Sequence, residues 1–174
     1  MTHVHTPVDD FSDCHAGILA TLKKMNHLPE QVAAAKAARE TAQAVLKMFE
    51  DVVINHHYEE EHDLFPAVLA SSQPGVERER VAAMIAQLTQ EHRAVEAAWG
   101  KLKSQVKAAA KGADTDLNGQ DVQDLVAHYL AHAGFEEQQF LPLSQEILGR
   151  NSNHLAALGV SLHMRHAKIP MSYI

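Results

Sequence analysis

Histidine and glutamate recur one helical turn apart in two distant parts of the chain. The segment HHYEEEHDLFP contains His57 and Glu61, and the segment HAGFEEQQFLP contains His132 and Glu136. Side chains four residues apart project from the same face of a helix, so each pair can offer an imidazole nitrogen and a carboxylate oxygen to one point in space. Imidazole with carboxylate is a donor set that suits iron or manganese.

Helix breakers divide the chain that must position these pairs. The clusters NHLPEQ, SSQPG and KGADTDLNGQ separate segments that are almost free of Gly and Pro. Within the segments, apolar residues recur at intervals of three and four, which indicates one inward-facing seam per helix. We therefore predict an all-α fold, an antiparallel up-down-up-down four-helix bundle with a short C-terminal fifth helix. The expected helices span about 9–27, 31–69, 76–110, 120–148 and 153–167.

Each of the four seams carries a histidine where an apolar residue is expected. His15 precedes His57 by 42 residues and His92 precedes His132 by 40, so the two halves of the chain look like one helical hairpin used twice. We expect a single domain, with residues 1–150 forming the bundle and residues 151–174 a helical extension packed on it. The predicted metal ligands are His15, His57, Glu61, His92, His132 and Glu136.

The alternative to a metal site is a set of surface hydrogen bonds, which is the usual role of a single H-x-x-x-E pair. Two further pairs, His56 with Glu60 and His92 with Glu96, flank the seams and are assigned to the outer faces. The seam residues differ because burying each uncompensated charge would cost several kcal/mol. Six ligands are too many for a tetrahedral structural zinc. Two carboxylates can bridge a pair of ions, so a di-iron centre is predicted, with manganese or zinc as alternatives.

Composition excludes several classes of function. The formal net charge is −7 and no basic cluster interrupts it, which argues against a nucleic-acid partner. No apolar stretch is long enough to cross a bilayer, and the N-terminal residues lack the layout of a signal peptide, so a cytoplasmic protein with no membrane partner is expected. Cys14 is the single cysteine and cannot form an internal disulfide.

The order of these motifs resembles the hemerythrin family, in particular its bacterial HHE cation-binding branch. The resemblance covers about residues 9–148: H, then H-x-x-x-E-x-x-x-F-P, then E-H, then H-x-x-x-E-E with a following Pro. It implies a non-haem, carboxylate-bridged di-iron site on the six residues named above. Oxygen carriers of the family have H-x-x-x-H on the third helix, whereas Leu88 and Glu96 flank His92 here. The chain is therefore more similar to family members that repair iron centres or respond to nitric oxide and oxidative stress.

Three functions remain open from the sequence. The leading one is a di-iron protein that senses, stores or reacts with O2, NO or peroxide, or donates iron. The second is a di-iron oxidoreductase with true turnover, similar to a peroxidase or a nitric oxide reductase, so enzymatic activity is left undecided. The third is a metal-free helical module that binds a partner protein. Pairing of the C-terminal segment with another subunit would give a homodimer.

Overall fold

The structure of the chain is a computed structural model that describes the backbone of residues 7–150 and the side chains of residues 14–150. This part is helical with short connections and contains no strand, so the all-α prediction is confirmed. None of its helices is long and apolar enough to span a membrane. The elements are α1 Pro7–Met25, α2 Leu28–Met48, η1 Phe49–Val53, α3 Ile54–Glu59, η2 Glu60–Leu64, α4 Phe65–Ser71, α5 Val76–Ala110, α6 Gly119–Phe135, η3 Glu136–Phe140 and α7 Leu141–Gly149, where η marks a π-helical turn.

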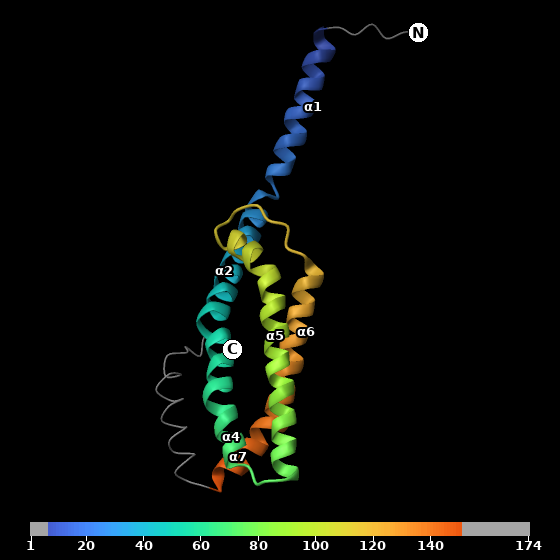
Figure 1. Cartoon of the computed structure of the whole chain (residues 1–174). Helices are drawn as coiled ribbons and strands as arrows, with labels where there is room; N and C mark the ends of the chain where they lie inside the picture. The colour runs from blue at the N-terminus through green and yellow to red at the C-terminus, as the bar shows by residue number, and fades with distance from the viewer. Residues whose placement is uncertain (1–6, 151–174) are drawn as a thin grey trace, which may run out of the picture.

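Three long helical stretches lie side by side (Figure 1). The stretch from α2 to α4 packs against α5, and the stretch from α6 to α7 packs against α5 and α4. The connections fall where the helix breakers predict them. Gly75 with φ 97° precedes α5, and Gly112 with φ 73° follows it, conformations that favour glycine. The side chain of Asn118 caps α6 by accepting from the backbone N–H groups of Gln120 and Asp121.

The placement of α1 differs from the expected antiparallel hairpin. It runs on from the N-terminal end of α2 and projects beyond the other helices (Figure 1). Every residue from Cys14 to Thr41 is exposed. The joint keeps helical backbone at His27, whose carbonyl accepts from Gln31 N–H at 3.1 Å. Pro29 sits in the first turn of α2, where its missing N–H costs no hydrogen bond, so nothing reverses the chain here. The fifth helix expected at 153–167 lies outside the described residues.

Two apolar clusters fill the space between the three stretches. One is centred on the stacked rings of Phe49 and Trp99, whose centroids are 4.2 Å apart. The other is centred on Phe65 and Phe140, which meet edge to face at 5.1 Å. Between these clusters the same helices bury a layer of histidine and glutamate side chains. The apolar packing on both sides therefore fixes the positions of the helices that carry this polar layer.

We predict that Phe140→Ala lowers the free energy of unfolding of the metal-free protein by about 3–5 kcal/mol, because Phe140 is fully buried and its loss leaves a cavity. Urea denaturation followed by circular dichroism measures this change. Val76→Ala is the control, since Val76 is 83% exposed, and it should shift stability by no more than about 0.5 kcal/mol. Equal effects of the two substitutions would contradict the packing described.

Candidate metal centre

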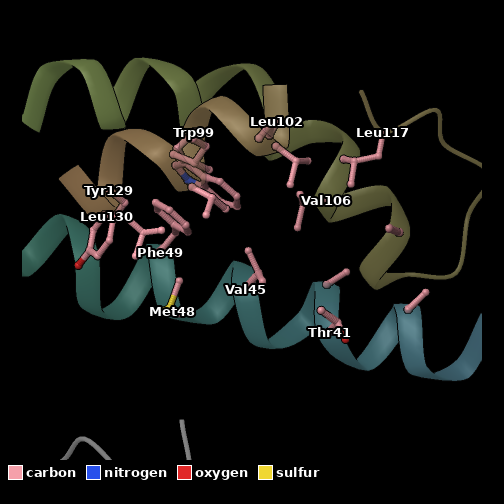
Figure 2. Close-up of a pocket in the computed structure, with 16 residues that line it drawn as sticks. Thr41, Val45, Met48, Phe49, Trp99, Leu102, Val106, Leu117, Tyr129 and Leu130 are labelled. Atoms are coloured by element: carbon pink, nitrogen blue, oxygen red, sulfur yellow. The ribbon is translucent and has the colours of Figure 1, made fainter. Parts of the chain in front are cut away.

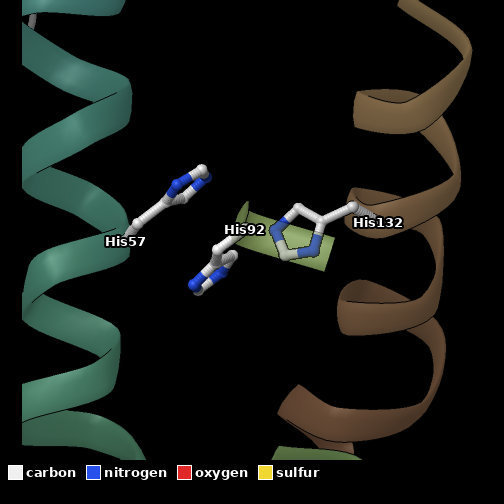
Figure 3. Close-up of side chains that lie close together, drawn as sticks. All are labelled: His57, His92 and His132. Carbon is white, nitrogen blue, oxygen red and sulfur yellow. The ribbon is translucent and has the colours of Figure 1, made fainter. Parts of the chain in front are cut away.

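Three buried histidines from three different helices converge (Figure 3). His57 lies on α3, His92 on α5 and His132 on α6, and each is at most 1% exposed. The rings of His57 and His92 stack at 3.9 Å, and the ring of His132 meets His92 edge-on at 4.8 Å. Each of the three can place one ring nitrogen within 4.8 Å of the others. The arrangement can therefore supply three imidazole ligands to one ion.

A second group of candidate ligands adjoins the three histidines. His56, Glu60 and Glu136 each have a ligand atom within 4.8 Å of the other two. His56 Nε2 lies 3.2 Å from Glu60, and the carboxyl groups of Glu60 and Glu136 are hydrogen-bonded to each other. The groups touch, because His92 Nε2 lies 3.2 Å from the other oxygen of Glu60. We call these six side chains the histidine–carboxylate cluster: His56, His57, Glu60, His92, His132 and Glu136.

Acidic side chains hold the outer nitrogen of each buried histidine. The Nδ1 atom of His57 lies 3.2 Å from Glu96, that of His92 lies 2.8 Å from Glu61, and that of His132 lies 3.2 Å from Glu91. A carboxylate can only accept, so each contact favours a proton on Nδ1 and turns Nε2 toward the interior. Carboxylate–histidine pairs of this kind orient imidazoles that bind metals.

Arg93 ties two of these outer acids together. Its guanidinium donates to both oxygens of Glu96, at 2.9 and 3.0 Å, and also to Glu61. Glu96 contacts His57 and Glu61 contacts His92. By fixing these two acids, Arg93 restricts the orientation of both imidazoles. The geometry of the buried site therefore depends on charges placed in a second layer around it.

The π-helical turns decide which acids face inward. The turn η2 begins at Glu60 and η3 begins at Glu136, and each ends just before a segment with proline in its first turn, Pro66 in α4 and Pro142 in α7. Proline cannot donate the usual i to i−4 hydrogen bond, and a wider turn accommodates the loss. The wider turn changes the angle between successive side chains. Glu60 and Glu136 consequently occupy matching inward positions in the two halves.

The structure brings together four of the six residues predicted as ligands and leaves two apart. His57, His92, His132 and Glu136 meet in the cluster, whereas Glu61 contacts the outer nitrogen of His92 instead of facing inward. His15 lies on the projecting helix α1 and is exposed. The sequence interpretation assigned His56 and Glu60 to an outer face, but Glu60 is only 4% exposed and faces Glu136.

A signal for Glu60 is present in the sequence. When HHYEEEHDLFP is aligned with HAGFEEQQFLP on their final prolines, His56 matches His132 and Glu60 matches Glu136. Counting four residues from His57 gives Glu61 instead. That count assumes a regular α-helix, but a π turn begins at Glu60. The outer acid Glu91 carries no comparable signal, since its contact with His132 joins helices far apart in the sequence.

The two buried carboxyl groups share a proton. Burial raises the pKa of Glu136, and its hydrogen bond to the negatively charged Glu60 raises it further, to about 9. Burial also opposes charge on Glu60, but its interactions with His92, whose Nε2 lies 3.2 Å away, and with Glu136 outweigh burial and lower its pKa to about 2. At neutral pH the metal-free site thus holds a carboxylate at Glu60 and a protonated carboxyl group at Glu136.

The histidines differ in their preference for a proton. Burial and the charge of His92 lower the pKa of His57 to about 4, although Glu96 opposes the shift. Burial and His92 likewise lower the pKa of His132. Burial opposes charge on His92 as well, but Glu60 and Glu61 raise its pKa above the usual value. Neutral His57 and His132 keep the lone pair that a metal ligand requires.

Buried atoms of the cluster fit a bound cation. His57 Nε2, His92 Nε2, Glu60 Oε2 and Glu136 Oε1 are buried and make no properly aligned hydrogen bond. Leaving a buried donor or acceptor unsatisfied costs roughly 1–3 kcal/mol for each group. A cation would use these lone pairs, and nitrogen and carboxylate donors together suit iron, manganese or zinc. The residues present therefore match a metal site.

A comparison with protein families identifies the chain. The family model of the hemerythrin HHE cation binding domain matches residues 6–144. The chain belongs to this family. Comparisons with curated proteins and with solved structures gave no match. As an HHE domain, the chain is a cation-binding protein, and the histidine–carboxylate cluster is the part of the described structure that fits this role.

We predict that Glu136→Gln stabilises the metal-free HHE domain at alkaline pH. Wild-type Glu136, with its pKa raised from 4.5 to about 9, keeps a proton that the unfolded chain loses, so stability falls as pH rises through this window. A glutamine cannot ionise and should flatten the decline between pH 7 and 9. Urea denaturation of chelator-treated protein at several pH values measures the slope. The exposed substitution Glu79→Gln should retain the wild-type slope; a wild-type slope in Glu136→Gln would contradict the shared proton.

Proposed function

We propose that this HHE domain binds two iron ions between the helices and uses them to sense or react with O2, NO or peroxide. The observation that carries the proposal is the presence of two adjoining ligand groups, one of three imidazoles and one with two carboxyl groups. A single ion would leave one group unsatisfied. Two ions held by the histidines together with Glu60 and Glu136 would use the inward-facing lone pairs of both groups.

The chain supplies orientation and electrostatics to such a pair of ions. Glu61, Glu91 and Glu96 hold the three buried imidazoles and make them stronger donors. Glu136 would have to release its proton before its carboxylate could hold a cation, so metal binding would be coupled to proton release. The ring of Phe65 stacks beside His92 at 5.9 Å and joins the site to the second apolar cluster. Iron, when bound, supplies an open position for a small ligand and the electrons to reduce it.

The cluster is almost closed to solvent. The three buried histidines are at most 1% exposed, whereas the side chain of His56 is 37% exposed. A site buried to this degree favours a small ligand such as O2, NO or peroxide as the reacting partner.

We predict that anaerobic loading with Fe(II) gives two iron ions per chain, measured by metal analysis after desalting. Glu60→Gln should reduce this to one ion or none, because an amide is a poor bridging ligand. Glu61→Gln should retain both sites but weaken metal affinity by roughly 10–100-fold, since it affects only the support of His92. Loading at neutral pH should release protons, which a pH indicator detects.

Substitution of the neighbouring glutamates, Glu60 and Glu61, distinguishes Glu60 as the metal ligand from Glu61, the ligand predicted from the sequence. Loss of iron in Glu61→Gln with full loading of Glu60→Gln would restore Glu61 as the ligand. No metal uptake by the wild-type chain would refute the proposed iron site and favour the metal-free partner-binding function. Glu79→Gln, a change on the surface of α5, serves as the control and should load like the wild type.

A second candidate function, an oxidoreductase with turnover, is favoured by the position of Tyr129. Its ring lies 6.0 Å from that of His132. Burial and the negative charges of Glu60 and Glu136 raise the pKa of the phenol, so it stays protonated near the acid pair. A protonated phenol beside the site is a candidate proton donor to a reduced ligand.

If turnover occurs, we predict that Tyr129→Phe lowers kcat for peroxide or nitric oxide reduction by roughly 10²–10⁴-fold, the usual contribution of a general acid. Iron content and affinity should remain unchanged, because Tyr129 is not among the predicted ligands. Steady-state assays with an added reductant measure kcat. An unchanged kcat in the iron-loaded variant would exclude Tyr129 as the proton donor.

A further inference from the structure

An apolar groove of about 640 Å³ runs along the body of the protein between α2 and α6, with α5 as its floor (Figure 2). Its α2 wall extends from Ala38 to Phe49, and its α6 wall extends from Val122 to Leu130. Large apolar side chains stand exposed along it, including Val126 at 50% and Leu130 at 68%. The groove lies where a fourth helix would complete a four-helix bundle with α2, α5 and α6.

A matching apolar stripe is exposed on the projecting part of the same chain. The spacing of its members is 4, 3, 3 and 4 residues, so the stripe lies on one helical face and continues from α1 across the joint into α2. Each member is about half exposed. The stripe consists of Ile18 50%, Leu22 51%, Met25 56%, Leu28 49% and Val32 60%.

The chain's own α1 cannot bring His15 to the cluster by folding back at the joint. His57 lies thirty residues beyond His27 along the α2 stretch, about 45 Å, whereas His15 lies twelve residues before it, about 18 Å. A hairpin at the joint would place His15 beside Arg39. A hairpin that paired His15 with His57 would need its turn near Lys36, inside an unbroken helix of the sequence VAAAKAARE. No Gly or Pro occurs between Pro29 and Pro66.

We propose that the groove is filled by α1 and the start of α2 from a second copy of this chain. The two copies are antiparallel and are related by a twofold axis near Lys36. Residue 15 of one copy then lies level with residue 57 of the other, and residue 57 of the first lies level with residue 15 of the second. On the α6 side the groove ends at Leu130, two residues before His132, whose ring lies 5.7 Å from that of His57, so this end is level with about residue 55 of α3. With its other end at Ala38, the groove then covers about residues 17–34 of the second copy. The stripe, residues 18–32, falls within this range.

Charge and side-chain size agree with the same register. Lys23 and Lys24 of the second copy come within one helical turn of the exposed Asp51 and of Glu50, which also pairs with Lys103 of its own chain at 3.0 Å. Near the axis both helices present alanines from the run that includes Ala33, Ala34 and Ala35, and small side chains allow close approach. The arrangement brings His15 of each copy level with the cluster of the other. Its contribution to metal binding rests on the proposed function, but the dimer itself does not.

Mass and cross-linking of the metal-free protein test the proposal. Light scattering during gel filtration should give twice the chain mass of 19.1 kDa. The native cysteine, Cys14, is exposed and should form a disulfide between copies when combined with Tyr58→Cys, because these positions are level in the dimer. Arg39→Cys should not react with Cys14, although it would do so within one chain if α1 folded back on its own α2.

A matched pair of substitutions on α1 separates the stripe from the opposite face. Leu22→Glu should give monomers, whereas Ala20→Glu, on the opposite face of the same helix turn, should leave the dimer intact. Circular dichroism of both variants checks that the helices remain. A monomeric wild-type protein, a Cys14 cross-link confined to one chain, or a dimer that tolerates Leu22→Glu would each overturn the proposal. None of these results depends on whether iron binds.

Discussion

The structure depends on a buried layer of polar side chains that the protein alone cannot satisfy. Two carboxyl groups and three imidazoles lie between two apolar clusters, and several of their inward-facing atoms have no aligned partner. Without a metal the layer reduces its charge by sharing a proton between Glu60 and Glu136 and by keeping His57 neutral. These protonation states are responses to desolvation, and a bound cation would compensate the buried negative charge that remains. The apolar clusters must therefore offset the free-energy cost of burying polar side chains whose role is to bind a cation.

The outer charges make this layer rigid. Each buried histidine is held at Nδ1 by an acid from a different turn or helix, and Arg93 connects two of these acids. Such contacts are partly exposed, so their contribution to stability is small. Their importance is geometric, because they fix the direction of each imidazole before a ligand arrives. A site prepared in this way loses little conformational entropy on binding.

Part of the site could be predicted from periodicity, and part could not. His57, His92, His132 and Glu136 interrupt apolar seams, and burial on a seam is what brings them together. The choice between Glu60 and Glu61 depends on a π turn, and simple counting assumes regular helix. Alignment of the two halves on Pro66 and Pro142 gives the acid that faces inward, since in both halves a π turn comes just before the proline. The outer partners Glu91 and Glu96 are tertiary contacts, which no local pattern indicates.

The position of α1 could not be predicted because the same seam is compatible with two partners. The pattern around His15 indicates only that one face of this helix needs to be buried, not whether the covering groove belongs to the same chain. The unbroken α2 is the reason for proposing a second copy, since α2 has no turn where an internal hairpin would need one. In the proposed dimer each cluster is completed by a histidine from the other copy, so binding of metal and association of chains stabilise each other by mass action. Occupancy of the site would then rise with protein concentration as well as with iron, a property that a closed single-chain bundle lacks.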